Sequence, residues 1–161
     1  MRGPPIFYFD FVVFPLLTVA LFAGWCRDLS FVYWSITGFW LFTFMEYWVH
    51  RIGLHVFFYH GDHERHHKHP TGYVTFPIYY TPAIFFAFWL AMPLGLFTGV
   101  VTGFVWFIFW HHVLHHFDLT HWPRFIRRYA IWHLAHHSDE TVNYGITVPI
   151  WDFIFLTYRK A

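Results

Sequence analysis

The sequence predicts an all-α integral membrane protein: four transmembrane helices form two hairpins, and a histidine-rich cap with interfacial helices lies on the cytoplasmic side. Composition, the lengths of the apolar segments and the positions of the histidines carry this prediction. Of 161 residues, 57% are hydrophobic, 27% aromatic and 12% charged, and about 25% charged residues is usual in soluble domains. A chain of this length cannot bury so many aromatic side chains in one aqueous core, so we expect lipid to surround it.

The first two spans are read directly from the apolar segments. A helix needs about 20 mostly apolar residues to cross a bilayer. Residues 6–25 meet this requirement, although Asp10 and Pro15 interrupt them, and residues 29–48 follow after a short polar turn. We therefore expect residues 6–25 to be a retained span rather than a cleaved leader, and residues 29–48 to return across the membrane.

The third and fourth spans come from one long uncharged segment. Residues 71–110 contain no Asp, Glu, Lys or Arg, and as one helix they would be about twice as long as the hydrocarbon layer is thick. We expect the segment to fold back once around residues 93–99, where Pro and Gly cluster. Thr81 followed by Pro82 is typical of a helix start. Residues 1–161 are treated as one domain.

The basic residues predict the orientation. With four spans, the N-terminus, the loop after the second span and the C-terminal segment share one side, and only Arg27 lies on the other. This bias predicts that both termini are cytoplasmic, in either a bacterial inner membrane or the endoplasmic reticulum. The shared side carries Arg2, Arg51, Arg65, Lys68, Arg124, Arg127, Arg128, Arg159 and Lys160.

Several functions are excluded. The formal net charge of +1 gives no basis for nucleic-acid binding. Cys26 is the only cysteine, so an intrachain disulfide and a multi-cysteine metal site are excluded. Neither G-x-G-x-x-G nor a phosphate-binding G-x-x-x-x-G-K-[ST] segment is present.

All 15 histidines lie between His50 and His137, at or beyond the ends of the second and fourth spans. The pattern H-x-x-H-H occurs three times, whereas roughly 0.1 occurrence is expected by chance. Positions i, i+3 and i+4 share a helix face, so each triplet is expected to aim three imidazoles at one point. The triplets are His63/His66/His67, His112/His115/His116 and His133/His136/His137, and His111 and His115 have the same i, i+4 relation.

His50 and His55 form a further pair. They are five residues apart, about 140° around an α-helix, so they would diverge if the helix continued. Gly53 lies between them. We therefore expect the helix to end there and His55 to fold back toward the other histidines.

A site rich in imidazoles and lacking thiolates suits iron, zinc, copper or nickel. One zinc takes four ligands, so about ten candidate histidines imply two metal ions, which we expect on the cytoplasmic side. The solitary histidines His60, His69 and His121 are expected to be interfacial polar residues instead.

Four segments, EYWVHRIGLH, HGDHERHHKHP, HHVLHH and HLAHHSDETVNYGITVPIWDFIFLTY, occur in this order within residues 46–158. Together they resemble the fatty acid hydroxylase/sterol desaturase superfamily of membrane di-iron enzymes. Their details are most similar to the sphingolipid fatty acid 2-hydroxylase branch. The resemblance implies an oxygenase that uses dioxygen to hydroxylate, or desaturate, a lipid drawn from the bilayer.

The resemblance also implies a ligand set for two iron ions, which zinc can replace in purified protein. In the third box His112 and His116 fit the family spacing as an alternative to His111 and His115. The implied ligands are His50, His55, His63, His66, His67, His111, His115, His133, His136 and His137.

Electrons are expected from a separate redox partner, a ferredoxin or a b-type cytochrome system, because the sequence shows no flavin, nicotinamide, haem or iron–sulfur motif. Arg124, Arg127 and Arg128 are either a docking patch for this carrier or anchors for anionic lipids, within a segment (residues 121–137) that reads as an interfacial helix. The apolar residues 144–158 are expected to pack against the bundle or lie at the interface.

Metal-bound histidines usually donate their other ring N–H to a carboxylate or a carbonyl. Glu46 lies four residues before His50 and is costly to bury unpaired, so it is the foremost such partner. Asn143, Tyr144 and Asp152 are further second-layer candidates, and the remaining carboxylates near the boxes are Asp62, Glu64, Asp139 and Glu140.

Two alternatives stay open. One is a carotenoid or sterol/hopanoid hydroxylase of the same superfamily. The other is a non-enzymatic membrane metal-binding protein or transporter, for which an ionisable residue near mid-membrane is expected and only Asp10 qualifies. The substrate, the position oxidised and the oligomeric state do not follow from the sequence.

Overall fold

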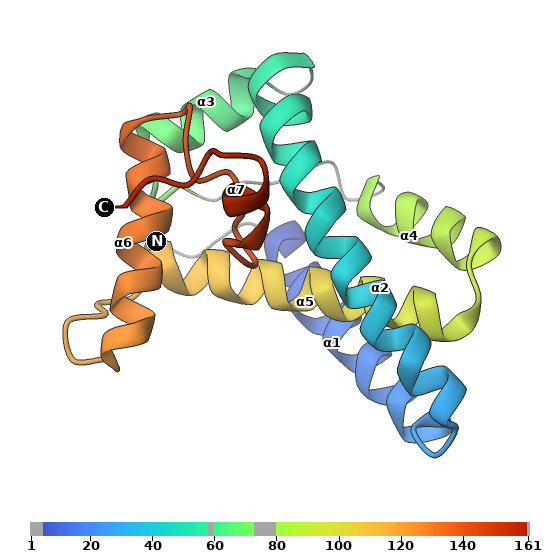
Figure 1. Ribbon diagram of the computed structural model, residues 1–161. Helices are drawn as coiled ribbons and strands as arrows, with labels where there is room; N and C mark the ends of the chain where they lie inside the picture. Colours follow the sequence, from blue (N-terminus) through green and yellow to red (C-terminus); the bar gives the residue numbers. More distant parts are fainter. Residues whose placement is uncertain (1–4, 58–59, 73–79, 161) are drawn as a thin grey trace. The chain divides into compact units, whose positions relative to one another are not determined.

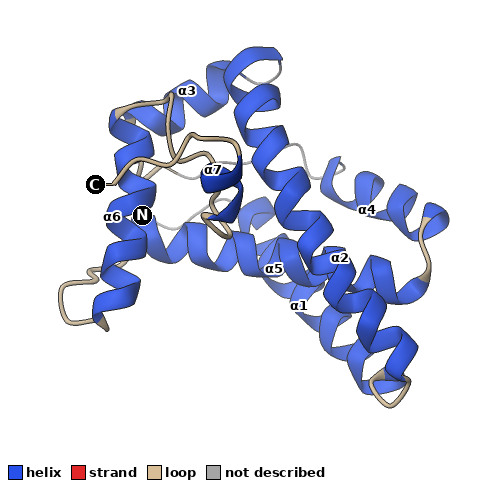
Figure 2. Cartoon of the chain, viewed as in Figure 1, coloured by secondary structure: helices blue, strands red, loops and turns tan. Residues whose placement is uncertain are grey.

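The computed structural model describes residues 5–57, 60–72 and 80–160, and this part of the chain is helical without a β-strand (Figures 1 and 2). The predicted all-α class is therefore confirmed. In chain order the elements are α1 (Pro5–Trp25), α2 (Leu29–Trp48), the π-helix η1 (Val49–Phe57), α3 (His60–Lys68), α4 (Tyr80–Ala91), α5 (Leu94–His116), α6 (Arg124–Ser138) and α7 (Ile150–Ile154).

The helices divide into two compact units. The aromatic unit comprises Met1–Phe42 and Tyr73–Ile108, and the histidine unit comprises Thr43–Gly72 and Phe109–Ala161. Helices α2 and α5 contribute residues to both units. All the histidines belong to the histidine unit, so the candidate site can be described within it.

The core of the aromatic unit is made by aromatic rings from α1, α4 and α5. The Phe14 ring lies 4.7 Å from the Phe85 ring and 5.1 Å from the Phe104 ring, measured between centroids. Val100 and Val101 are fully buried beside them. Asp10 of α1 accepts a 3.5 Å hydrogen bond from the Thr81 hydroxyl, so this hydroxyl binds a neighbouring helix.

The chain folds back where Pro93 lies, but the two glycines after it have another role. Helix α4 ends at Ala91 and α5 begins at Leu94. Gly95 and Gly99 lie inside α5, where they let its backbone touch α2. A Cβ atom on Gly95 would lie 2.8 Å from the Phe31 carbonyl oxygen. Small residues thus permit close helix contact here instead of forming the predicted turn.

Two helices in the described part of the chain are long and apolar enough to cross a bilayer, α1 over Tyr8–Trp25 and α5 over Leu94–His116. The predicted first two spans coincide with α1 and α2 as helices. Helix α4 is apolar but has only 12 residues, and residues 73–79, at the start of the predicted third span, lie outside the described residues. Four spans therefore remain a prediction.

In the histidine unit, the C-terminal segment packs against the end of α2. The Trp151 indole donates a 3.0 Å hydrogen bond to the Thr43 hydroxyl. Tyr47 has no exposed surface, and its ring stacks on Phe155 at 5.2 Å. Of the two placements expected for residues 144–158, the structure shows packing within this unit.

The first prediction concerns the glycine contact between α2 and α5. Gly99→Val should lower the free energy of unfolding by about 1–3 kcal/mol, because an overpacked contact forces the backbones of the two helices apart. Its Cβ would lie 2.7 Å from the Phe39 backbone nitrogen and 2.8 Å from the Gly38 Cα. Thermal unfolding in detergent measures the loss. Gly24→Val is the control, since nothing lies within 4 Å of a Cβ there, and equal stability of the two variants would contradict the contact.

Candidate metal centre

Two groups of imidazoles converge in the histidine unit. Cluster A contains His50 and His55 from η1, His63 and His67 from α3, and His136 from α6. Cluster B contains His66 from α3, His111 and His115 from α5, and His137 from α6. Within each group the potential ligand atoms lie within 4.8 Å of one another. His133 joins cluster B, because its Nε2 lies 2.9 Å from that of His115.

The π-helix explains how His50 and His55 meet. Residues five apart lie above one another when hydrogen bonds run from i to i+5, as in a π-helix. The two rings are 5.1 Å apart between centroids. The expected helix end at Gly53 is therefore wrong: the helix continues to Phe57 and winds more widely, which brings the pair together.

Two of the three H-x-x-H-H triplets, those on α3 and α6, divide their side chains between the two clusters. Adjacent helical residues point about 100° apart, so the last two histidines of a triplet cannot face one point. On α3, His63 and His67 face cluster A while His66 faces cluster B. On α6 the adjacent pair is divided in the opposite order: the first residue, His136, belongs to cluster A and the second, His137, to cluster B. The expectation that each triplet aims at one point is corrected on this ground.

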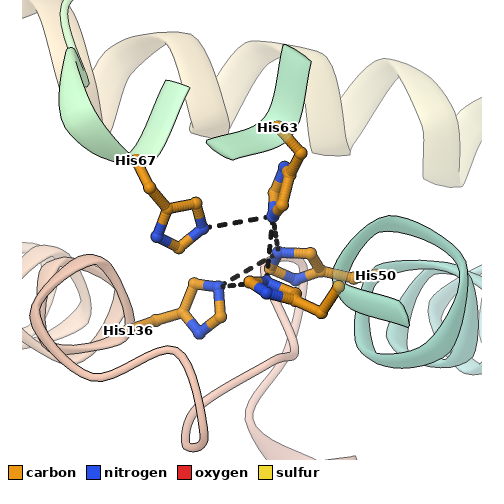
Figure 3. Close-up of side chains that lie close together, drawn as sticks. His50, His63, His67 and His136 are labelled. Atoms are coloured by element: carbon orange, nitrogen blue, oxygen red, sulfur yellow. Dashed lines mark hydrogen bonds between the residues drawn. The ribbon is translucent and has the colours of Figure 1, made fainter. Parts of the chain in front are cut away.

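The Nε2 atoms of cluster A face one another at short distances (Figure 3). The Nε2 of His63 lies 3.1 Å from that of His50, 2.9 Å from that of His55 and 3.1 Å from that of His67. The Nε2 of His136 lies 3.1 Å from those of both His50 and His55. With metal–nitrogen bonds of about 2.1 Å, two ligand nitrogens at right angles lie about 3 Å apart. The spacing thus fits a shared metal ion.

Cluster B has similar spacings. The Nε2 atoms of His66 and His111 are 3.2 Å apart, and the rings of His66, His115 and His137 are within 4.8 Å of one another. The rings of the third-box alternatives, His112 and His116, lie 4.4 Å apart between centroids, and both residues belong to neither cluster. His69 and His121 are exposed, and the side chains of His60 and Asp62 lie outside the described part of the chain.

Burial keeps these imidazoles neutral. Desolvation, reinforced by the neighbouring imidazoles His55 and His67, lowers the pKa of His63 to about 2. Desolvation likewise lowers the pKa of His66 to about 4 and that of His136 to about 3. Neutral imidazole is the form that binds a metal, so at neutral pH the Nε2 lone pairs are available.

A single loop orients two imidazoles of cluster A from behind. The Nδ1–H of His50 donates to the Tyr144 carbonyl at 2.5 Å, and the Nδ1–H of His136 donates to the Val142 carbonyl at 2.7 Å. The Tyr144 ring also borders the cluster, 5.4 Å from the ring of His136. These bonds set the tautomer that points Nε2 into the cluster.

Two buried carboxylates hold this loop. Glu46 accepts the backbone N–H groups of Ile146 at 2.7 Å and Thr147 at 3.1 Å. Asp152 accepts those of Tyr144 at 2.7 Å and Gly145 at 2.9 Å. Glu46 and Asp152 therefore act on the imidazoles through the backbone, and the expected direct partnership of Glu46 with a histidine is replaced by this indirect one.

Asn143 secures the start of the same loop. It has a φ of 55°, a left-handed conformation that asparagine tolerates better than most residues. Its amide donates to the carbonyls of Trp132 at 3.1 Å and Arg159 at 3.0 Å. All four predicted second-layer residues thus belong to or hold the loop of residues 142–147.

The sequence did not predict which groups face the Nδ1 atoms, the ring nitrogens that point away from the clusters. The carbonyls of Val142 and Tyr144 belong to the backbone, so no residue type in the sequence indicates their role. Glu140, considered only as one of several carboxylates near the boxes, lies 3.4 Å from the His55 Nδ1 and 3.6 Å from the His67 Nδ1. Its place three residues after His137, the end of the last histidine triplet, was the one available indication.

A helical scaffold that gathers ten imidazoles into two clusters defines a protein with a candidate two-metal histidine centre. A family model described as fatty acid hydroxylase matches residues 35–157, which include every histidine of both clusters. The chain belongs to the fatty acid hydroxylase family. The resemblance noted in the sequence is thereby confirmed.

Two similar proteins illustrate this membership. Dihydroceramide fatty acyl 2-hydroxylase FAH1 from Arabidopsis thaliana is 31% identical over 195 residues, which cover 97% of this chain and 80% of that protein. A solved structure described as "Full length scs7p (only hydroxylase domain visible)" matches with a TM-score of 0.77 at 23% identity. The match covers 95% of this chain and 66% of that chain, and it shows that the two share a fold.

The second prediction concerns the loop of residues 142–147. Glu46→Gln should lower the free energy of unfolding by about 1–3 kcal/mol, because an amide oxygen satisfies one of the two backbone N–H groups and its NH₂ opposes the other. Unfolding in detergent, followed by circular dichroism, measures the loss. Asp118→Asn, at an exposed position, should change it by less than about 0.5 kcal/mol. A Glu46→Gln variant as stable as this control would contradict the role of Glu46.

Proposed function

We propose that this chain is a membrane-bound di-iron oxygenase that hydroxylates the fatty acyl chain of a lipid of the sphingolipid type. The observation that carries the proposal is the pair of imidazole clusters with facing Nε2 atoms. Family membership supports an oxidoreductase acting on lipids. Similarity to the plant relative, a dihydroceramide fatty acyl 2-hydroxylase, supports this substrate class over carotenoids or sterols.

The donor set fits two transition-metal ions. Ten uncharged nitrogen ligands without thiolates suit iron, and zinc can take its place at such sites. His50, His55, His63, His67 and His136 would hold one ion. His66, His111, His115, His133 and His137 would hold the other. When bound, the two ions supply the activation of dioxygen for C–H oxidation, chemistry that no side chain provides.

The chain's own residues prepare this site in two ways. The carbonyls of Val142 and Tyr144 hold His136 and His50 in the orientation that a metal requires. Burial excludes water, since His50 is 2% exposed and His136 is fully buried, and a dry site strengthens electrostatic interactions and protects a reactive oxidant. Two electrons for each turnover would come from a separate donor protein.

The third prediction separates ligands from solitary histidines. His136→Ala should abolish the oxygenated product and lower the bound metal, because His136 faces both His50 and His55. His69→Ala, at an exposed position, should retain both. Lipids are extracted from cells that express the protein and are hydrolysed. The released fatty acids are then analysed by mass spectrometry for the mass increase that corresponds to one added oxygen. Loss of two hydrogens would instead identify a desaturase.

Two further results would overturn the proposal. Equal product from the two variants would refute the ligand assignment. Binding of two metals with no change in the fatty acids or other lipids, when an electron donor is supplied, would favour a non-enzymatic metal-binding protein.

We further propose that the chain crosses the membrane four times with both termini in the cytoplasm. The support is the excess of basic residues on the side of the termini, together with the two long apolar helices α1 and α5. The exposed residues Arg124, Arg127 and Arg128 of α6 would then face anionic lipid headgroups at the cytoplasmic surface.

The fourth prediction uses the single native thiol. Cys26 is exposed between α1 and α2, and in the proposed topology a membrane-impermeant maleimide should label it from the non-cytoplasmic side of sealed cells or vesicles. In a Cys26→Ser background, Ser138→Cys at the end of α6 should be labelled only after the membrane is opened. The opposite pattern would reverse the orientation, and labelling of both from one side would refute the odd number of spans, three, that the proposed topology places between them.

A further inference from the structure

The two clusters differ in the groups behind their imidazoles. In cluster A, four of the five Nδ1 atoms face an oxygen: those of His50 and His136 donate to backbone carbonyls, at 2.5 Å and 2.7 Å. Those of His55 and His67 lie 3.4 Å and 3.6 Å from the carboxylate of Glu140, an electrostatic contact in which the His67 Nδ1 makes no hydrogen bond. The outer side of cluster A is therefore largely supplied with acceptors, one of them an anion.

Cluster B lacks this support. The Nδ1 atoms of four of its five imidazoles are buried, and no residue in the described part of the chain accepts a hydrogen bond from any of them. These four are His66, His115, His133 and His137. The contrast arises because the loop of residues 142–147 and Glu140 both lie behind cluster A.

Glu140 is placed to serve two imidazoles at once. Its Oε2 faces His55 of η1 and its Oε1 faces His67 of α3, so one carboxylate connects two elements. The neighbouring Asp139 has a different role, since it accepts the Thr141 backbone N–H at 3.1 Å and also binds Arg159. Glu140 is about half exposed, which leaves its charge available without the cost of full burial.

An acceptor on the outer N–H makes an imidazole a more basic ligand, and a charged acceptor does so more strongly than a neutral one. We propose that the two metal sites are unequal: cluster A, with Glu140 as the anionic partner of His55 and His67, binds its divalent cation more tightly than cluster B. This inference rests on the proposed two-metal function and assigns Glu140 a role as a positioning residue.

The fifth prediction is tested with Co²⁺ as the probe. The full chain in detergent is stripped of metal with a chelator and titrated while the visible absorption of bound Co²⁺ is recorded. Two binding phases of different affinity are expected. Glu140→Gln should weaken the tighter phase by about 10–100-fold and leave the weaker phase unchanged. Glu64→Gln is the matched control, because Glu64 lies on α3 but pairs with Lys68 at 2.6 Å, and it should change neither phase.

Each binding phase can be assigned to one cluster by disabling the other cluster with a substitution. His115→Ala disables cluster B, so the site that remains should be the tight one and should still respond to Glu140→Gln. His63→Ala disables cluster A, because its Nε2 lies within 3.1 Å of those of three other members. The site that then remains should be weak and insensitive to Glu140→Gln.

The outcomes separate this inference from the proposed function. Two Co²⁺ ions bound with equal affinity would overturn the inequality of the sites. A Glu140→Gln effect on cluster B or on neither cluster would overturn the role of Glu140. Both results would leave two-metal binding intact. Failure of the unmodified chain to bind two ions would overturn the proposed function itself. The two Co²⁺ affinities are compared in the unmodified chain, so that comparison stands even if a variant fails to fold.

Discussion

The convergence of neutral imidazole nitrogens is the constraint on which the histidine unit depends. Lone pairs that face one another at about 3 Å repel unless a cation or a proton lies between them, so such an arrangement needs both burial and orientation. Burial comes from four elements, η1, α3, α5 and α6. Orientation comes from behind, where carbonyls and a carboxylate hold the outer ring nitrogens of cluster A.

Helix geometry distributes the side chains between the clusters. An α-helix places i and i+4 on one face, which gathers His63 with His67 and His111 with His115. The same geometry turns the adjacent residue away, which is how α3 and α6 each supply both clusters. His50 and His55 need the wider winding of η1 because their spacing is five. Among the helices in the described part of the chain, the π-helical winding occurs at the pair that requires it.

The loop of residues 142–147 connects distant parts of the sequence to one site. Its carbonyls face the imidazoles, and its N–H groups are held by Glu46, nearly a hundred residues earlier, and by Asp152. Buried carboxylates are costly unless several donors satisfy them, and backbone N–H groups supply those donors here. The stability of the loop and the position of the imidazoles are thus parts of one hydrogen-bond network, which is concentrated on cluster A.

The sequence by itself determined the helical class, through its composition and apolar segments, and the family, through the order of its histidine segments. The resemblance to the family implied the ten histidines that the structure brings together, with His112 and His116 left open as an alternative to His111 and His115. Only the tertiary structure decided how His66 and His67, neighbours in the chain, divide between two clusters, and that Gly95 and Gly99 serve a helix contact. It also placed Glu140 and the loop carbonyls behind cluster A. These features depend on contacts between segments that are far apart in the sequence, so no local pattern could predict them. Every residue has a backbone carbonyl, so the residue type does not indicate which carbonyls face the imidazoles.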